Sequence, residues 1–116
     1  MKKVLLIGAG KSSGYLIDYL LKHAVAEQYE LTVADLNMEA ALLKTKGLPN
    51  SKAIVLDIND AAQRNKHIEE ANIVISMLPA YMHFPVAQDC INLKRHLVTA
   101  SYISPEIMTL NESAWQ

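Results

Sequence analysis

The most constraining feature of this 116-residue chain lies at its start, where a short apolar run leads directly into a glycine-rich turn. The run Val4–Ile7 has the continuous apolar character of a strand that is buried on both faces. Gly8 and Gly10 then end this strand, and the apolar periodicity that follows predicts a helix over about 11–27. A strand, a Gly-x-Gly turn and a helix in this order are typical of a binding site for the pyrophosphate of a dinucleotide.

The residue types of the turn suit a bound pyrophosphate. Gly8 permits a tight turn, Gly10 lacks the Cβ that would hold a phosphate away from the backbone, and the small Ser13 allows close packing of helix on strand. We therefore expect the whole turn to contact the cofactor, namely Gly8, Ala9, Gly10, Lys11, Ser12 and Ser13. The alternative is an ordinary strand-to-helix turn, in which Lys11 is a solvated surface residue.

Five short apolar segments alternate with helical patterns along the rest of the chain. We expect strands at about 3–7, 30–35, 53–57, 72–77 and 96–100, and helices at about 11–27, 38–46, 61–70, 84–93 and from 104 onward. Asn37 and Asp60 are the expected N-caps of the second and third helices. This alternation predicts an α/β fold, a Rossmann-type doubly wound parallel sheet with strand order 3-2-1-4-5 and helices on both faces, as one domain over 1–116.

Acidic residues follow the second and third predicted strands, at the edge where such sheets bind ligands. Asp35 lies roughly 20 residues after the turn, the spacing of a carboxylate that accepts hydrogen bonds from the adenosine ribose, and Leu36 is assigned to the same contact. Asp57 and Ile58 are expected at the adenine edge. The alternatives are an ordinary surface or capping aspartate at 35 and a cap for the third helix at 57, where both roles can coexist. Because a carboxylate at the ribose repels a 2′-phosphate, Asp35 predicts NAD as the preferred cofactor, with NADP as the alternative.

Composition excludes several other classes of function. A net charge of −1 with scattered lysines and arginines gives no nucleic-acid or membrane partner, and no apolar run has the length of a membrane span. Cys90 is the single cysteine, so the chain has neither an internal disulfide nor a zinc-ligand pattern, and we expect a cytoplasmic protein with Cys90 buried and inert. No metal site is expected.

Two further runs carry a family resemblance. They are Ser76-Met77-Leu78-Pro79 with His83 four residues on, and His96-Leu97-Val98-Thr99-Ala100-Ser101-Tyr102-Ile103-Ser104-Pro105. With these runs, essentially the whole chain resembles the N-terminal part of the saccharopine dehydrogenase family, and within it the glutamate-forming saccharopine reductases.

The resemblance implies an NAD(P)-dependent oxidoreductase that acts on the CH–NH bond of an amino-acid-derived secondary amine in lysine metabolism. It places Leu78 and Pro79 at the nicotinamide, and Ser101 and Tyr102 where the substrate meets it. His83 is assigned to the same substrate side, and a polar cap or surface residue is its alternative. Members of the family carry a long second domain, so we expect the amino-acid-like substrate to need residues beyond this chain, and no catalytic residue within it. A homodimer is compatible with the sequence.

The chain departs from the family pattern at two places. Relatives often have alanine where Ser13 stands, and members that use NADP often have an uncharged residue followed by arginine where this chain has Asp35-Leu36-Asn37. Two other readings stay open, a regulatory nucleotide-sensing module and a structural domain that kept the fold. The hydroxyl-rich run after the fifth strand favours the enzyme, because a sensor has no need of hydroxyls at the nicotinamide end.

Overall fold

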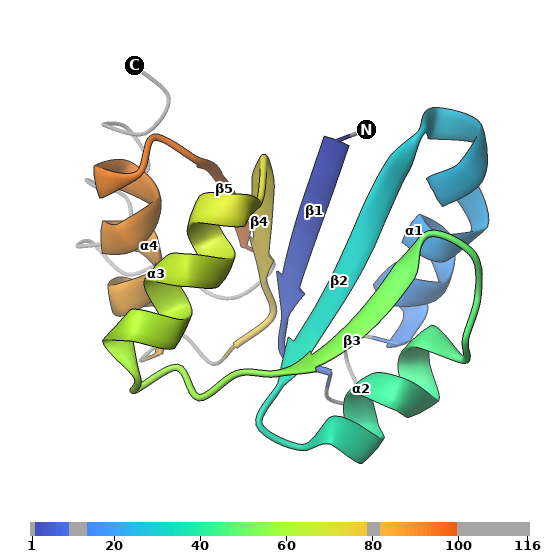
Figure 1. Ribbon diagram of the computed structural model, residues 1–116, viewed down its shortest axis with the longest axis horizontal. Coiled ribbons are helices and arrows are strands. Elements are labelled where there is room, and N and C mark those ends of the chain that lie inside the picture. Colours follow the sequence, from blue (N-terminus) through green and yellow to red (C-terminus); the bar gives the residue numbers. More distant parts are fainter. Residues whose placement is uncertain (1, 10–13, 79–81, 100–116) are drawn as a thin grey trace.

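The computed structural model describes residues 2–9, 14–78 and 82–99 of the chain. Its elements alternate along the chain, as the sequence predicts (Figure 1). The strands are β1 (Lys2–Ile7), β2 (Tyr29–Asp35), β3 (Ser51–Val55), β4 (Ile73–Ser76) and β5 (His96–Thr99). The helices are α1 (Gly14–Glu27), α2 (Met38–Thr45), α3 (Ala61–Glu70) and α4 (His83–Asn92).

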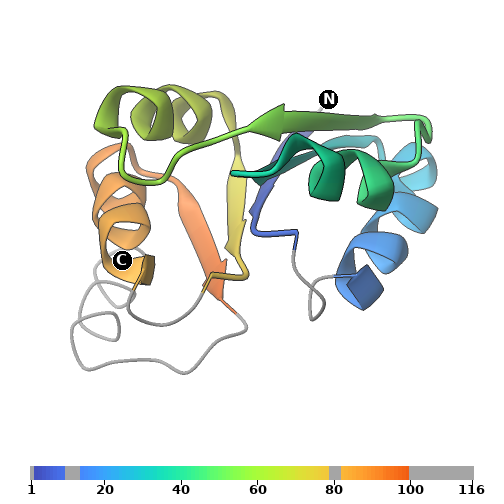
Figure 2. The same ribbon diagram turned by 90° about the horizontal axis from the view of Figure 1, so that it is seen from below.

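The five strands form one parallel sheet in the order β3-β2-β1-β4-β5, which confirms the predicted topology. Figures 1 and 2 show α1 and α2 on one side of this sheet and α3 and α4 on the other. The connection after β1 leads to β2 on one side, and the connection after β3 returns across the sheet to β4 on the other side of β1. The strand order therefore reverses at β1, and ligands of such sheets bind at this point, beyond the carboxyl ends of the strands.

The central strand β1 supplies both hydrophobic cores. Leu5 and Ile7 belong to the core under α3 and α4, whereas Val4 and Leu6 belong to the core under α1 and α2. Successive side chains of a strand point to opposite faces, so a run of four apolar residues is what a sheet covered on both faces requires. The packing of helices on both sides fixes the position of the turn that follows Ile7.

Both predicted N-caps are present. The Asn37 side chain accepts hydrogen bonds from the backbone N–H groups of Glu39 and Ala40, at 2.9 and 3.4 Å, and the Asp60 side chain accepts one from Gln63 at 3.2 Å. Each cap supplies a partner for N–H groups that the first turn of a helix leaves free. The caps therefore start α2 and α3 a few residues beyond the carboxyl ends of β2 and β3.

The predicted end of the third strand is wrong by two residues, because β3 ends at Val55 and not at Asp57. Val55 pairs with Asp35, the last residue of β2, so β3 has no further strand residue to pair with beyond this point. Leu56 still donates its N–H to the Asp35 carbonyl at 3.0 Å, and Asp57 then begins a tight turn. The predicted start of the helix over 11–27 and the predicted helix from 104 lie outside the described residues.

Cys90 is fully buried in α4, as predicted. No helix in the described part of the chain is both long enough and apolar enough to cross a membrane.

Candidate dinucleotide site

The first component of the site is the turn after β1. Gly8 has a φ of +103°, a conformation that side-chain-bearing residues rarely adopt. Its N–H donates to the Ala34 carbonyl of β2 at 2.8 Å, which holds the turn against the end of the neighbouring strand. A Cβ at Gly8 would lie 3.4 Å from the carbonyl carbon of Met77, an ordinary contact distance. Backbone conformation, more than lack of space, therefore requires glycine here.

The second component is the carboxylate at the end of β2. Asp35 Oδ2 accepts a hydrogen bond from the Ala9 N–H at 2.7 Å, and Oδ1 accepts one from the Asn37 N–H at 2.9 Å. One side chain thus joins the glycine turn to the start of α2. Each carboxylate oxygen accepts more than one hydrogen bond, so both can also receive a ribose hydroxyl. The sequence predicts that Asp35 binds the ribose. It does not predict that Asp35 also holds the glycine turn, because this depends on a contact between residues far apart in sequence.

The third component is the wall that follows β3. The Asp57 carboxylate accepts a hydrogen bond from the Asn59 N–H at 2.9 Å, and the Asp60 N–H donates to the Asp57 carbonyl at 2.9 Å. The cap of α3 is Asp60, so the alternative that Asp57 caps this helix is not the arrangement found. Asp57 therefore shapes its own turn through one carboxylate oxygen, and the other oxygen accepts no hydrogen bond from the described residues.

These three components enclose a cavity of about 130 Å³ at the carboxyl edge of the sheet. Its lining includes most of the described residues that the sequence assigned to the cofactor: Gly8, Asp35, Leu36, Asp57, Ile58 and Leu78. Leu56 and Met82 also line it, and they complete an apolar wall opposite the carboxylates. Apolar walls with a few fixed polar groups are typical of cofactor pockets. The apolar wall suits a flat aromatic ring, and the two carboxylates suit the hydroxyls of a ribose.

A buried ion pair that the sequence did not reveal supports this wall. Arg64 of α3 pairs through Nε with the carboxylate of Asp89 of α4, and both side chains are largely buried. Arg64 Nη1 also donates to the Ile58 carbonyl at 2.7 Å. The guanidinium therefore holds the wall of the cavity to both helices on that side of the sheet. No local spacing rule connects Arg64 with Asp89, since they lie on different helices.

Several predicted site residues cannot be placed in this geometry. Gly10, Lys11, Ser12, Ser13, Pro79, Ser101 and Tyr102 lie outside the described residues. His83 is the first residue of α4, so its backbone follows the segment after β4 as expected. Within the described ranges, no three histidine, cysteine or acidic side chains gather as a metal site would require. Ser76 ends β4 with a fully buried hydroxyl that has no hydrogen-bond partner among the residues that the structure describes.

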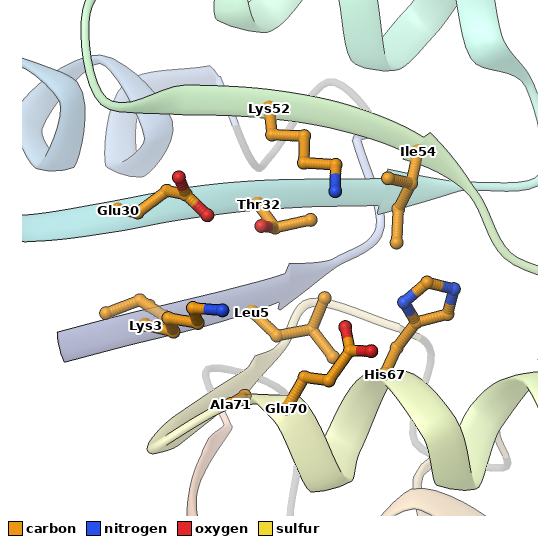
Figure 3. Close-up of a pocket in the computed structure, with 10 residues that line it drawn as sticks. Lys3, Leu5, Glu30, Thr32, Lys52, Ile54, His67, Glu70 and Ala71 are labelled. Carbon is orange, nitrogen blue, oxygen red and sulfur yellow. The ribbon is translucent and has the colours of Figure 1, made fainter. Parts of the chain in front are cut away.

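A second hollow, of about 50 Å³, lies toward the opposite edge of the sheet, between β1, β2, β3 and α3 (Figure 3). Lys3, Glu30, Lys52, His67 and Glu70 surround it with charges of both signs. Burial lowers the pKa of His67, and the charge of Glu70 opposes this shift. None of the residues assigned to the cofactor lies in this hollow. The predicted residues therefore converge on the cavity at the carboxyl edge alone.

The fold and this cavity together define a class of protein. A doubly wound parallel sheet with a positive-φ glycine after its first strand and a carboxylate after its second has the organisation of Rossmann-type dinucleotide-binding domains. Comparison with known proteins gives the particular family. The family model described as "Saccharopine dehydrogenase NADP binding domain" matches residues 4–116, and the chain belongs to this family.

Individual relatives agree with this assignment. The chain is 34% identical to saccharopine dehydrogenase [NADP(+), L-glutamate-forming] of Schizosaccharomyces pombe, over 98% of this chain and 25% of that protein. It is 33% identical to alpha-aminoadipic semialdehyde synthase of Arabidopsis thaliana, over 96% of this chain and 12% of that protein. Apo saccharopine dehydrogenase (L-Glu forming) of Saccharomyces cerevisiae superposes with a TM-score of 0.83 at 34% identity, covering 97% of this chain and 24% of that chain.

These comparisons bear on the family, the length and the cofactor of the chain. The resemblance drawn from the sequence runs is confirmed, and so is the expected fold class. The chain spans about a quarter of the saccharopine dehydrogenases it matches and about an eighth of the synthase. The family description names NADP, which favours NADP over the NAD expected from Asp35.

Proposed function

We propose that this chain is the cofactor-binding domain of a saccharopine dehydrogenase-type oxidoreductase, and that the cavity at the carboxyl edge binds the adenosine half of a nicotinamide dinucleotide. The observation that carries the proposal is the convergence of Gly8, Asp35 and the Asp57–Ile58 turn on one cavity at the reversal point of the sheet. Family membership supports the same cofactor class.

In this proposal the residues of the chain bind the cofactor and orient it. Asp35 accepts the ribose hydroxyls while it holds Ala9 and Asn37, so the glycine turn is already shaped before the cofactor arrives. The cavity wall that contains Asp57 and Ile58 packs against the adenine, and Leu78 and Pro79 border the nicotinamide. The remaining turn residues, Gly10, Lys11, Ser12 and Ser13, contact the pyrophosphate. The bound cofactor supplies the hydride chemistry.

NADP is the proposed cofactor, in place of the NAD that the sequence favoured. The fungal relatives are named as NADP(+) enzymes, which supports this choice. Asp35 is compatible with it because its two oxygens already receive backbone N–H groups, which offset part of the negative charge that a 2′-phosphate would meet.

The proposed reaction concerns the CH–NH bond of an amino-acid-derived secondary amine, as the resemblance to saccharopine dehydrogenases implies, and relatives that bear this name support the proposal. Ser101, Tyr102 and His83 are proposed to face this substrate. A substrate with several carboxylates needs charged partners, and among the described residues Arg64 is already committed to Asp89. The 1–116 domain is therefore proposed to work as the N-terminal part of a longer enzyme. Cytoplasmic location and a homodimer remain predictions of the sequence.

Titration calorimetry of the 116-residue chain with NADPH and with NADH tests the proposed function. We expect saturable binding of NADPH, and no oxidation of NADPH or reduction of NADP when saccharopine or its precursors are added. Absence of binding to either cofactor would contradict a cofactor domain. Steady turnover by this chain alone would contradict the proposed need for further residues.

A further inference from the structure

The side chain of Lys44 crosses from α2 to the start of α1. An ideal Cβ built on Gly14 would lie 2.7 Å from Lys44 Nζ, 3.7 Å from its Cε and 3.9 Å from its Cδ. The end of the lysine side chain therefore lies directly over the first residue of α1. Gly14 is helical and has no positive φ, so its backbone does not require glycine. The missing Cβ instead provides the space that the ammonium occupies.

Among the described residues, no acidic side chain pairs with this ammonium, and it makes no hydrogen bond, although the residue is half-buried. Lysine side chains ordinarily extend their charge into open water. Here the charge lies between two helices that pack on the same side of the sheet. A cation in such a place is suited to an anion that arrives from outside the chain.

The place proposed for the adenosine ribose would bring such an anion toward the start of α1. The ribose of a dinucleotide lies beyond the end of the second strand, which is Asp35 in this chain. Asp35 is hydrogen-bonded to the glycine turn that precedes α1 and to the N-cap of α2. In the proposed complex, a group on the ribose 2′ oxygen faces the two segments that Asp35 joins, the turn before α1 and the start of α2. NADP differs from NAD only by a phosphate on this oxygen.

We propose that Lys44 is a specificity-determining residue that attracts the 2′-phosphate of NADP, and that Gly14 is small in order to admit its ammonium. This assignment rests on the proposed function of the same site. It explains how a chain with Asp35 after β2, and without an arginine in the run Asp35-Leu36-Asn37, can bind the cofactor that its family description names. In this assignment the positive charge that faces the 2′-phosphate comes from Lys44 in the last turn of α2, and not from an arginine just before the first turn.

The first test is Lys44→Met, which keeps most of the apolar stem and removes the charge. Dissociation constants for NADPH and NADH are measured by titration calorimetry on the 116-residue chain. We expect the NADPH affinity to fall about 10- to 100-fold, the range of one charge-assisted contact, and the NADH affinity to change less than about threefold. Lys22→Met is the matched control, because Lys22 is an exposed lysine of α1 and its loss changes the net charge equally.

The second test is Gly14→Ala. Its Cβ would meet the ammonium at 2.7 Å and displace it, while alanine in a helix favours folding. We expect a smaller loss of NADPH affinity in the same direction, again without loss of NADH affinity. Unchanged NADPH affinity in Lys44→Met, or an equal loss for both cofactors, would overturn the assignment. If the unmodified chain bound neither cofactor, the proposed function would fail, and this assignment with it.

Discussion

At the scale of single residues, Gly8 sets the geometry of the site. Its φ of +103° turns the chain at the end of β1, and its N–H is fixed to the end of β2. Gly47 also has a positive φ, of +65°, but it lies after α2 with open space around it. Gly8 therefore belongs to the turn that shapes the site, whereas Gly47 belongs to the ordinary end of a helix.

Replacing each of these glycines by alanine should have different costs. Gly8→Ala forces a side chain into a sparsely populated conformation against Met77, and we expect a loss of about 2–3 kcal/mol in the free energy of unfolding. Gly47→Ala adopts a left-handed helical conformation in open space, and we expect a smaller loss of about 1–2 kcal/mol. Urea denaturation of both variants measures the difference. Equal costs would show that the turn at Gly8 is not specially constrained.

At the scale of elements, α3 and α4 are tied together by the Arg64–Asp89 pair. This pair also reaches the Ile58 carbonyl, so the packing of two helices determines where one wall of the cavity stands. Breaking a buried pair leaves one charge without compensation, which costs more than the pair itself contributes.

Asp89→Asn tests the importance of this tie. The substitution keeps the shape of the side chain and removes its charge, and we expect the free energy of unfolding to fall by about 2–4 kcal/mol. Asp18→Asn on the exposed side of α1 should change it by less than about 0.5 kcal/mol. Denaturation midpoints of the two variants give the comparison. A loss no larger for Asp89→Asn than for Asp18→Asn would mean that the ion pair contributes nothing to stability.

The same helix α4 contains a pH-dependent contribution to stability. Burial, with a smaller contribution from the charge of Asp89, raises the pKa of the Cys90 thiol to about 12. In the unfolded chain the thiol titrates near pH 8.5, so the folded state keeps a proton that the unfolded state loses. The stabilising effect of the neutral thiol is complete below about pH 8.5 and is lost as the pH rises toward 12.

Comparison of wild type with Cys90→Ala tests this pH dependence. The variant has a constant packing defect, so only the slope of stability against pH is compared. Between pH 7.5 and 9.5 we expect the wild type to lose about 1.4 kcal/mol more than the variant. Parallel stability curves over this range would indicate that the thiol ionises as readily in the folded chain as in the unfolded one.

At the scale of the whole molecule, strand order and the two cores followed from the sequence because they depend on local patterns. Val4–Ile7 is apolar throughout and Asn37 and Asp60 are strong caps, so element types and their sequence along the chain were predictable. The end of β3 was not, because it depends on where its partner β2 stops.

The site could be predicted as a set of residues but not as a set of contacts. Gly8, Asp35 and Asp57 follow strand ends, and all parallel strands end at one edge. The bond from Ala9 to Asp35, the Arg64–Asp89 pair and the Lys44–Gly14 approach each join different elements. Such contacts depend on how helices pack on the sheet, which no spacing along the chain encodes.

The cavity at the carboxyl edge and the hollow of Figure 3 allow a direct test of the central claim, which is that the cofactor binds at the carboxyl edge. Two-dimensional amide NMR spectra of the chain are recorded while NADPH is added. We predict that the signals that shift come from residues that line the cavity at that edge, Gly8, Asp35 and Asn59, and from Ala9 and Asn37, which are hydrogen-bonded to Asp35. Signals around the hollow of Figure 3, from Lys3, Lys52, His67 and Glu70, should stay in place. Shifts concentrated at that hollow, with the carboxyl edge unaffected, would contradict the account.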